Sequence, residues 1–323
     1  MKKILNFIFT LLLISCSNES QENNSELDNK NYITVATLNG KDEEVEIEVP
    51  YNPKRIAILD MAAFDILDSL NEADRVVGSA RGDNIVYLNK YLENKDLENI
   101  GTIKEADIEK IIALDVDVIF IGRRLRDSYD ILSEIAPVIC LAVDGKTGVV
   151  DGVRKNALTI AKLFGKESLV NELMSGFDSR IKKLNDFAKD KTAIVGITSA
   201  GSFSVLGSDG RCSLITKEVG FKNVGISDTS STSTHGNEAS FEFVVDKDPD
   251  YMFILDRDTA IGRKPSKSSK ELIENELIVN TDVYKDGNII YLENPTIWYI
   301  AEGGIKALDI MISDLEKEVL ENN

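Results

Sequence analysis

The sequence predicts an α/β fold of two lobes, each with a mostly parallel sheet flanked by helices, joined by one long rigid helix. From residue 55 onward, short apolar runs alternate with helical patterns, which is the order expected of a parallel sheet covered by helices. A stretch without any strand signal, from Gly148 to Lys189, divides this alternation into two regions. Roughly 290 folded residues also exceed the usual size of a single hydrophobic core, so two lobes are expected.

The first region, residues 46–146, is the predicted amino-terminal lobe. Its expected elements are a strand at 55–59, a helix at 62–70, a strand at 76–79, a helix at 108–114 and a strand at 118–122. In residues 147–166 the apolar side chains follow helical spacing and Gly165 offers a stop. This segment is therefore the predicted interlobe helix.

The second region, residues 167–323, is the predicted carboxy-terminal lobe. Strand and helix signals alternate again within it. The expected elements are strands at 192–198, 251–255 and 289–292, followed by a closing helix at 303–320.

The amino terminus predicts a signal peptide at residues 1–15. Lys2 and Lys3 precede an apolar run at 4–14, and a Ser-Cys pair ending at Cys16 follows as a lipobox. The run is shorter than the about 20 residues that a membrane-spanning helix needs. We therefore expect an extracytoplasmic protein, anchored to the cell membrane by a lipid on Cys16. The polar composition that follows predicts a flexible tether at 16–45.

The charge balance excludes some partners. The chain has 37 basic and 55 acidic residues and a net charge of -18. Removal of residues 1–15 takes away two lysines and no acids, which leaves 35 against 55, or about -20. This balance argues against nucleic acid and against an anionic lipid surface as partners. The two remaining cysteines, Cys140 and Cys212, are predicted to be unpaired and buried.

An internal repeat indicates that the two lobes are related halves. Six residues recur at one separation of 133, since 242 minus 109 and 257 minus 124 give the same value. The residues Glu109, Asp115, Asp117, Phe120, Ile121 and Arg124 recur as Glu242, Asp248, Asp250, Phe253, Ile254 and Arg257. In each half an acidic residue begins a helix, an Asp-x-Asp turn and a buried strand follow, and an arginine stands just past the strand.

Arginines are the candidate ligand-binding residues. Ligands of open parallel sheets bind beyond the carboxyl ends of the strands, so each lobe is expected to direct an arginine into the crevice between them. The candidates are Arg123, Arg124 or Arg126 from the first lobe, with Arg211 and Arg257 from the second. Because a guanidinium presents a planar fork of donors to anionic oxygens, this set predicts a polyanionic ligand.

His235 and Tyr299 are the candidate metal-binding residues. His235 is the only histidine and lies in a polar loop, so zinc sites built from several histidines are excluded. Tyr299 follows Trp298 in a turn before the last helix, and a phenol is an oxygen donor that ferric iron can deprotonate. Together they could complete an iron shell that a small chelator leaves open. The sequence contains no Gly-x-Ser-x-Gly elbow and no Gly-rich phosphate loop.

These residues lie in segments that resemble the binding lipoproteins of ferric-siderophore ABC importers, the class with two lobes joined by a single long helix. The resemblance covers nearly all of the mature chain. The matching segments are 52–56, 101–111, 234–236, 256–257 and 298–299. The last three resemble the subgroup that binds catecholate complexes.

The resemblance implies roles for single residues. The implied iron ligands are His235 and Tyr299, and the implied ligand-binding residues are Arg211, Arg257 and Trp298. The first-lobe arginine is either Arg123 or Arg124, because the segment 122–126 is one residue longer than the usual segment of the family. The internal repeat favours Arg124.

The resemblance also implies a monomeric binding protein without catalytic residues. Fe³⁺ would be carried as a siderophore complex, with no permanent cofactor, and the complex would pass to an ABC permease. Glu109 and Glu242, one on each lobe, would pair with arginines of that permease. Two alternatives stay open: a haem-binding lipoprotein that uses Tyr299 or His235 as axial ligand, and an extracytoplasmic enzyme with His235 as general base.

Overall fold

The computed structural model describes residues 31–82, 85–144, 147–226, 236–265 and 267–321. The described residues from Tyr32 onward form one compact unit. The predicted signal peptide, Cys16 and the first half of the predicted tether lie outside the described residues. Within the described ranges, no helix is long and apolar enough to cross a membrane.

A β-hairpin opens the described chain. Strand β1 (Tyr32–Leu38) pairs antiparallel with β2 (Glu44–Pro50) along its whole length. The Thr37 hydroxyl accepts a hydrogen bond from the Cys140 amide at 2.7 Å and donates to the Cys140 carbonyl at 3.2 Å, so the hairpin is bound to the first lobe. The prediction of a tether up to residue 45 is therefore wrong from residue 32 onward. The alternating apolar residues of β2 already carry a strand signal.

The first lobe is built on a five-stranded sheet in the order β5-β4-β3-β8-β9, and every neighbouring pair is parallel. Its strands are β3 (Ile56–Leu59), β4 (Val76–Ser79), β5 (Glu98–Asn99), β8 (Val118–Gly122) and β9 (Val138–Leu141). Its helices are α1 (Met61–Ser69), α2 (Asn89–Leu92), α3 (Ile108–Ala113) and α4 (Tyr129–Ser133), and a small hairpin joins β6 (Gly101–Thr102) to β7 (Glu105–Ala106).

The second lobe has a mixed sheet in the order β13-β11-β10-β14-β15, with β12 beside β10. The contacts of β10 with β12 and β14, and of β14 with β15, are parallel. Its strands are β10 (Thr192–Ser199), β11 (Ser202–Val205), β12 (Lys222–Asn223), β13 (Asn237–Glu238), β14 (Tyr251–Asp256) and β15 (Ile289–Tyr291). Its helices are α8 (Ser213–Thr216), α9 (Phe241–Lys247), α10 (Arg257–Ala260), α11 (Ser269–Ile273), α12 (Asp282–Lys285) and α13 (Ile305–Glu316). The predicted two-lobed α/β class is confirmed.

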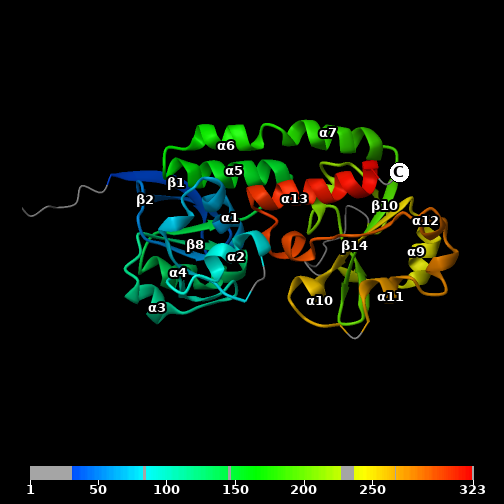
Figure 1. The fold of residues 1–323 in the computed structure, drawn as a ribbon, viewed down its shortest axis with the longest axis horizontal. Helices are drawn as coiled ribbons and strands as arrows, with labels where there is room; N and C mark the ends of the chain where they lie inside the picture. The colour runs from blue at the N-terminus through cyan, green and yellow to red at the C-terminus, as the bar shows by residue number, and fades with distance from the viewer. Residues whose placement is uncertain (1–30, 83–84, 145–146, 227–235, 266, 322–323) are drawn as a thin grey trace, which may run out of the picture. The chain divides into compact units, whose positions relative to one another are not determined.

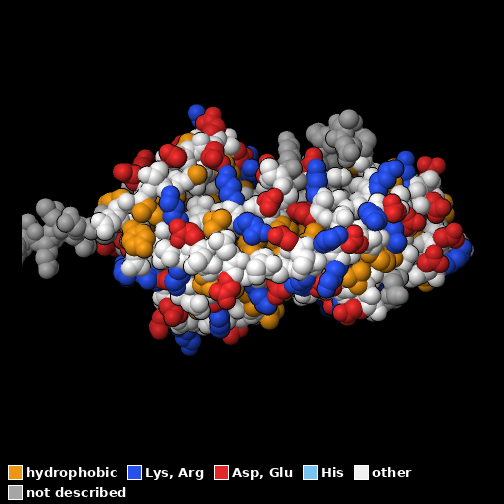
Figure 2. All heavy atoms as spheres, turned by 90° about the horizontal axis from the view of Figure 1, so that it is seen from above, with side chains coloured by type: hydrophobic (Ala, Val, Ile, Leu, Met, Phe, Trp, Pro, Cys, Tyr) orange, Lys and Arg blue, Asp and Glu red, His pale blue; other side chains and the backbone are white. Residues whose placement is uncertain are grey.

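Three helices occupy the strand-free stretch. Helix α5 (Val149–Lys162) corresponds to the predicted interlobe helix, and α6 (Glu167–Met174) and α7 (Phe177–Ala188) follow it before β10. Helices α6 and α7 form a layer over α5 and α13 (Figure 1). Seen from that side, acidic and basic side chains alternate over the surface, as expected for a solvated helical face (Figure 2). One hydrophobic core continues from the strands of both lobes into α13.

The internal repeat has a structural meaning. Asp117 accepts hydrogen bonds from the amides of Lys54 and Arg55 at 2.7 and 3.0 Å, just before β3. Asp250 accepts from the Thr192 amide at 2.7 Å, at the start of β10. In each lobe the same aspartate thus ties the strand that follows it, β8 or β14, to the neighbouring central strand.

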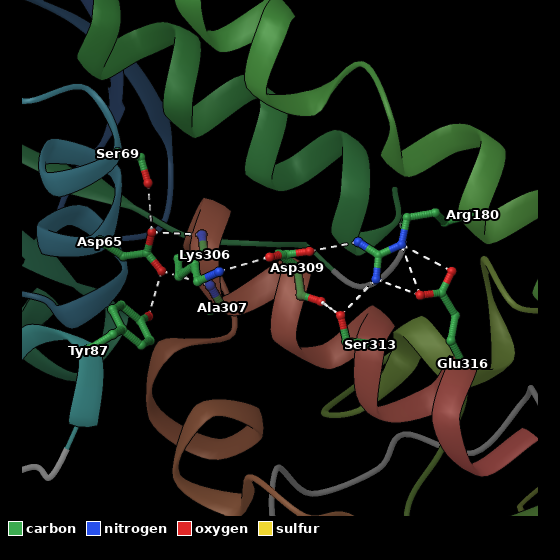
Figure 3. Close-up of polar contacts among 9 residues, drawn as sticks. All are labelled: Asp65, Ser69, Tyr87, Arg180, Lys306, Ala307, Asp309, Ser313 and Glu316. Carbon is green, nitrogen blue, oxygen red and sulfur yellow. Dashed lines mark hydrogen bonds and ion pairs between the residues drawn. The ribbon is translucent and has the colours of Figure 1, made fainter. Parts of the chain in front are cut away.

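Two carboxylates, Asp65 and Glu218, each accept hydrogen bonds at the start of a helix that is distant in sequence. Asp65 of α1 is fully buried and accepts hydrogen bonds from the amides of Lys306 and Ala307 at 2.9 and 2.8 Å, at the amino terminus of α13 (Figure 3). Tyr87 and Ser69 also donate to it, at 2.5 and 3.3 Å. Burial nevertheless raises the pKa of Asp65 to about 6.

Glu218 caps a second helix in the same way. It follows α8 in the second lobe and accepts hydrogen bonds from the amides of Val149 and Val150, the latter at 3.0 Å, at the amino terminus of α5. A glycine precedes each of the two helices, Gly148 and Gly304. A Cβ atom added to either glycine would meet the carboxylate of Glu218 or Asp65, so both glycines are required by close approach.

The glycine before α13 can be tested against a matched glycine. Gly304→Ala is expected to destabilise the protein by about 1–3 kcal/mol, because its Cβ would displace the Asp65 carboxylate. Gly176 also precedes a helix and has a similar φ of -87°, against -89° for Gly304, but a Cβ there would meet nothing within 4 Å. Urea unfolding should therefore show less than about 1 kcal/mol of change for Gly176→Ala. Equal losses in the two variants would contradict the proposed role of Asp65.

Candidate functional site

A cavity of about 770 Å³ lies at the carboxyl ends of β8 and β14 and is lined by residues of both lobes. The first lobe contributes Arg123, Arg124 and Arg126, which follow β8, and the second contributes Arg211 and Arg257, which lies directly after β14. The cavity therefore occupies the position that the strand ends predict, and all five candidate arginines line it.

Tyr299 is the centre of an arginine cluster in this cavity. Its phenolic oxygen accepts a hydrogen bond from Nε of Arg257 at 2.9 Å. Its carbonyl oxygen accepts from Arg211 at 2.8 Å and from Arg124 at 3.1 Å. The three guanidinium carbons lie 3.9 Å (Arg211), 5.7 Å (Arg124) and 5.7 Å (Arg257) from the centroid of the ring, within the range of cation–π interaction. Predicted residues from both lobes thus converge on Tyr299.

The neighbouring Trp298 fixes the direction of Tyr299. Both belong to a π-helical turn, Ile297–Ala301, whose side chains are buried. The indole Nε1 of Trp298 donates to Asp314 of α13 at 2.9 Å, and its side chain is 0% exposed. Trp298 does not line the cavity, so the prediction that it contacts the ligand is wrong. Its indole faces the core and holds the turn in place, which leaves Tyr299 facing the arginines.

The acidity of Tyr299 follows from these contacts. Burial alone would raise the pKa of its phenol, but the hydrogen bond from Arg257 and the charges of Arg211, Arg257 and Arg124 outweigh that effect and lower the pKa. A phenol of this kind loses its proton more readily to a Lewis acid. It is an oxygen donor suited to a hard, highly charged cation such as Fe³⁺.

The geometry distinguishes the first-lobe arginines, whose roles the sequence left open. Arg124 contacts Tyr299, as the internal repeat favoured. Arg123 forms an ion pair with Asp42 at 3.1 Å, and Arg126 also pairs with Asp42, although both line the cavity. Of the three first-lobe arginines, only Arg124 therefore belongs to the cluster around Tyr299.

Sequence reasoning missed the acidic residues of the cavity wall, which are Asp60, Asp144, Asp209 and Glu302. Asp60 caps α1, with its carboxylate accepting from the Ala63 amide at 2.9 Å, and burial raises its pKa. Glu302 follows the Tyr299 turn, and burial raises its pKa against the opposing charge of Arg211. Asp60 directly follows β3, so the same strand-end rule that selected the arginines could have found it. Glu302 carried no signal apart from its nearness to Tyr299.

The remaining predicted residues are His235, Glu109, Glu242 and the two cysteines. His235 lies outside the described residues. Glu109 and Glu242 are exposed, and each stands in the first turn of its helix, α3 or α9, away from the cavity lining. Cys140 and Cys212 are buried and unpaired, as predicted. In the described part of the chain, no cluster of His, Cys, Asp and Glu side chains could hold a metal ion.

Comparison with known proteins assigns this fold and cavity to a family. The family described as periplasmic binding protein matches residues 56–296, which include both central sheets and the three arginines of the cluster and end just before Tyr299. The chain therefore belongs to the periplasmic binding protein family, whose name indicates an extracytoplasmic binding protein. The predicted family resemblance is confirmed.

Similar proteins carry more specific names. The petrobactin-binding protein YclQ of Bacillus subtilis is 32% identical over 312 residues, which cover 96% of this chain and 95% of YclQ. The crystal structure of YclQ matches with a TM-score of 0.82 over 90% of this chain and 99% of the other. The ferric-anguibactin-binding protein FatB of Vibrio anguillarum is 28% identical over 82% of both chains. The periplasmic catecholate-siderophore binding protein VctP of Vibrio cholerae is 28% identical, with a TM-score of 0.79 over 88% and 99%.

The lowered acidity of Tyr299 can be measured directly. In an alkaline titration followed by ultraviolet absorbance, one tyrosinate should form below the ordinary pKa of 10, and Tyr299→Phe should remove it. Arg257→Gln should move this component toward higher pH, because the phenolate then loses its hydrogen-bond donor and one positive charge. Tyr32→Phe, which removes a tyrosine with 55% of its surface exposed, is the control and should retain the component. An unchanged titration in Tyr299→Phe would contradict the assignment.

Proposed function

We propose that this protein binds a ferric siderophore, of the catecholate type, in the cavity between its lobes and delivers it to an ABC importer for iron uptake. The observation that carries the proposal is the cluster of three guanidinium groups, drawn from both lobes, around Tyr299. Arg257 donates to the phenolic oxygen, and Arg124 and Arg211 donate to the backbone carbonyl with their guanidinium groups near the ring. The names of the three relatives support the ligand class. None of those names refers to haem or to a reaction.

The charge of the cavity matches such a ligand. Catecholate oxygens carry negative charge when they bind Fe³⁺, and guanidinium groups donate paired hydrogen bonds to oxygens of this kind. The aromatic rings of a catecholate also fit beside Tyr299 and the planar guanidiniums. A volume of about 770 Å³ is appropriate for a small chelate.

Iron is the cargo in this proposal, and Tyr299 and His235 are its protein ligands. Tyr299 supplies a phenolate oxygen whose negative charge the arginines stabilise. His235 would supply a nitrogen, a role that rests on the family resemblance of residues 234–236. The two groups would complete the iron shell when a tetradentate siderophore leaves two positions open.

The remaining parts of the proposal concern delivery. A lipid on Cys16 would hold a monomeric, non-enzymatic protein at the outer face of a cell membrane. Glu109 and Glu242 are related by the internal repeat, are exposed, and lie on different lobes. Such a pair suits a two-fold symmetric permease that carries complementary arginines.

Ligand class can be tested with the fluorescence of Trp298, the only tryptophan, which lies next to Tyr299. Saturable quenching is expected with a tetradentate ferric catecholate but not with a ferric trihydroxamate or haem. Arg211→Gln and Arg257→Gln should each weaken binding by about ten- to a hundredfold, as expected for lost charge-assisted hydrogen bonds.

A matched charge change controls for long-range electrostatics. Arg154 pairs with Asp178 at 3.3 Å and does not line the cavity, so Arg154→Gln should leave affinity within about twofold of wild type. Binding of haem alone would favour the haem-importer alternative. Absence of any saturable response would reject the proposed ligand class.

The permease contact predicts a separation of binding from transport. The double variant Glu109→Gln, Glu242→Gln should retain wild-type affinity for the ferric complex and lower siderophore-dependent iron uptake at least several-fold, since both docking charges are lost. Glu167 is an exposed acid in the first turn of α6 and serves as the control. Uptake should be measured in iron-starved cells that depend on the introduced copy. Normal uptake by the double variant would reject the docking role.

A further inference from the structure

The turn between β1 and β2 brings a carboxylate to the arginines of the cavity wall. Asp42 lies 3.1 Å from Nε of Arg123 and also forms an ion pair with Nη1 of Arg126. The side chains of Arg123 and Arg126 are 46% and 47% exposed, and Asp42 is 29% exposed. Both arginines line the cavity, whereas Asp42 does not. One carboxylate therefore engages two of the five cavity arginines from behind.

The turn holds Asp42 rigidly in this position. Asp42 adopts a left-handed conformation with φ of 60°. The side-chain oxygen of Asn39 accepts hydrogen bonds from the backbone amides of Lys41 and Glu43 at 2.8 and 3.0 Å. The backbone amide of Asn39 donates to the Glu43 carbonyl at 2.9 Å. Because these hydrogen bonds lie within the turn, the turn keeps its shape without the ion pairs of Asp42.

The hairpin is also attached to the lobe independently of Asp42. Thr37 exchanges hydrogen bonds with the backbone of Cys140, and Gly40 packs closely enough against Arg126 and Tyr129 that an added Cβ would lie 3.1 Å from the Arg126 carbonyl. These contacts do not involve the Asp42 carboxylate. The two ion pairs of Asp42 are therefore not needed to attach the hairpin to the lobe.

We propose that Asp42 is a specificity determinant of the cavity, one that lowers its attraction for highly charged anions. This inference rests on the proposed function and adds a charge preference to it. With Asp42 in place, the inner cluster of Arg124, Arg211 and Arg257 presents its positive charge to the ligand, while Arg123 and Arg126 are partly neutralised. A ferric bis-catecholate, with one net negative charge, needs only the inner cluster. A ferric tris-catecholate, with three negative charges, would gain more from the outer pair and is repelled more by Asp42.

The test compares Asp42→Asn with a matched variant of the same hairpin. Asparagine tolerates a left-handed backbone, so this substitution removes the charge and retains the turn. Glu44→Gln removes one negative charge from an acid that begins β2 and pairs with Lys155. Thermal unfolding and circular dichroism should confirm that both variants fold like wild type.

Affinities for a tetradentate ferric bis-catecholate and a hexadentate ferric tris-catecholate are then measured for each variant. Asp42→Asn should strengthen binding of the triply negative complex by about two- to fivefold and of the singly negative complex by less than about twofold. Glu44→Gln should change the ratio of the two affinities by less than about 1.5-fold. The gain should shrink in an Arg126→Gln background and at about 1 M salt, where the Debye length is about 3 Å.

The outcomes separate the inference from the proposed function. If wild type binds neither complex, the proposed ligand class fails. If wild type binds at least one of them and Asp42→Asn and Glu44→Gln alter the affinities alike, the effect is one of net charge and the role of Asp42 is rejected. A gain of undiminished size in the Arg126→Gln background would also overturn it, because the effect would not pass through Arg126.

Discussion

The rest of the site depends on the contact between the buried carboxylate of Asp65 and the amino terminus of α13. It belongs to the first lobe, yet it satisfies the first amides of α13, which would otherwise lack partners, and it places negative charge at the positive end of that helix (Figure 3). Helix α13 in turn carries Asp314, which binds the indole of Trp298 and so directs Tyr299 into the cavity. A chain of contacts therefore leads from a first-lobe carboxylate to the proposed iron ligand of the second lobe.

Glu218 of the second lobe similarly accepts hydrogen bonds from the first amides of the interlobe helix α5, so both α5 and α13 are capped by a carboxylate distant in sequence. Separating the first lobe from α13 would leave the buried Asp65 carboxylate without the amides of Lys306 and Ala307, which is costly for a buried charge. Arg180 of α7 adds a second attachment to α13 through Asp309, Ser313 and Glu316 (Figure 3). A cavity whose arginines come from both lobes needs such a fixed connection, since small rotations would move Arg124 away from Tyr299.

The parts of the fold that local pattern determines were predictable. Strands β8 and β14 are short apolar runs behind an Asp-x-Asp turn, and the arginines just past them do meet at Tyr299. The first part of the β1–β2 hairpin was predicted as flexible tether, because it directly follows a polar segment. Trp298 was misjudged since adjacent residues point in different directions and only Asp314 decides which one faces the core. The contacts of Asp65 join residues 241 and 242 positions apart, and no local signal reveals them.

The capping of α5 and α13 by distant carboxylates has a consequence for how the chain folds. During vectorial emergence, α5 and its uncapped amides appear well before Glu218, and Asp65 remains without its helix amides until α13 arrives. The caps of α5 and α13 can form only after residues far along the chain are present. The last steps of folding therefore form contacts of very high sequence separation. Such long-range closure is slow compared with local helix formation. The chain is thus expected to stay loosely packed until its final helix is present, and then to become rigid in a single cooperative step.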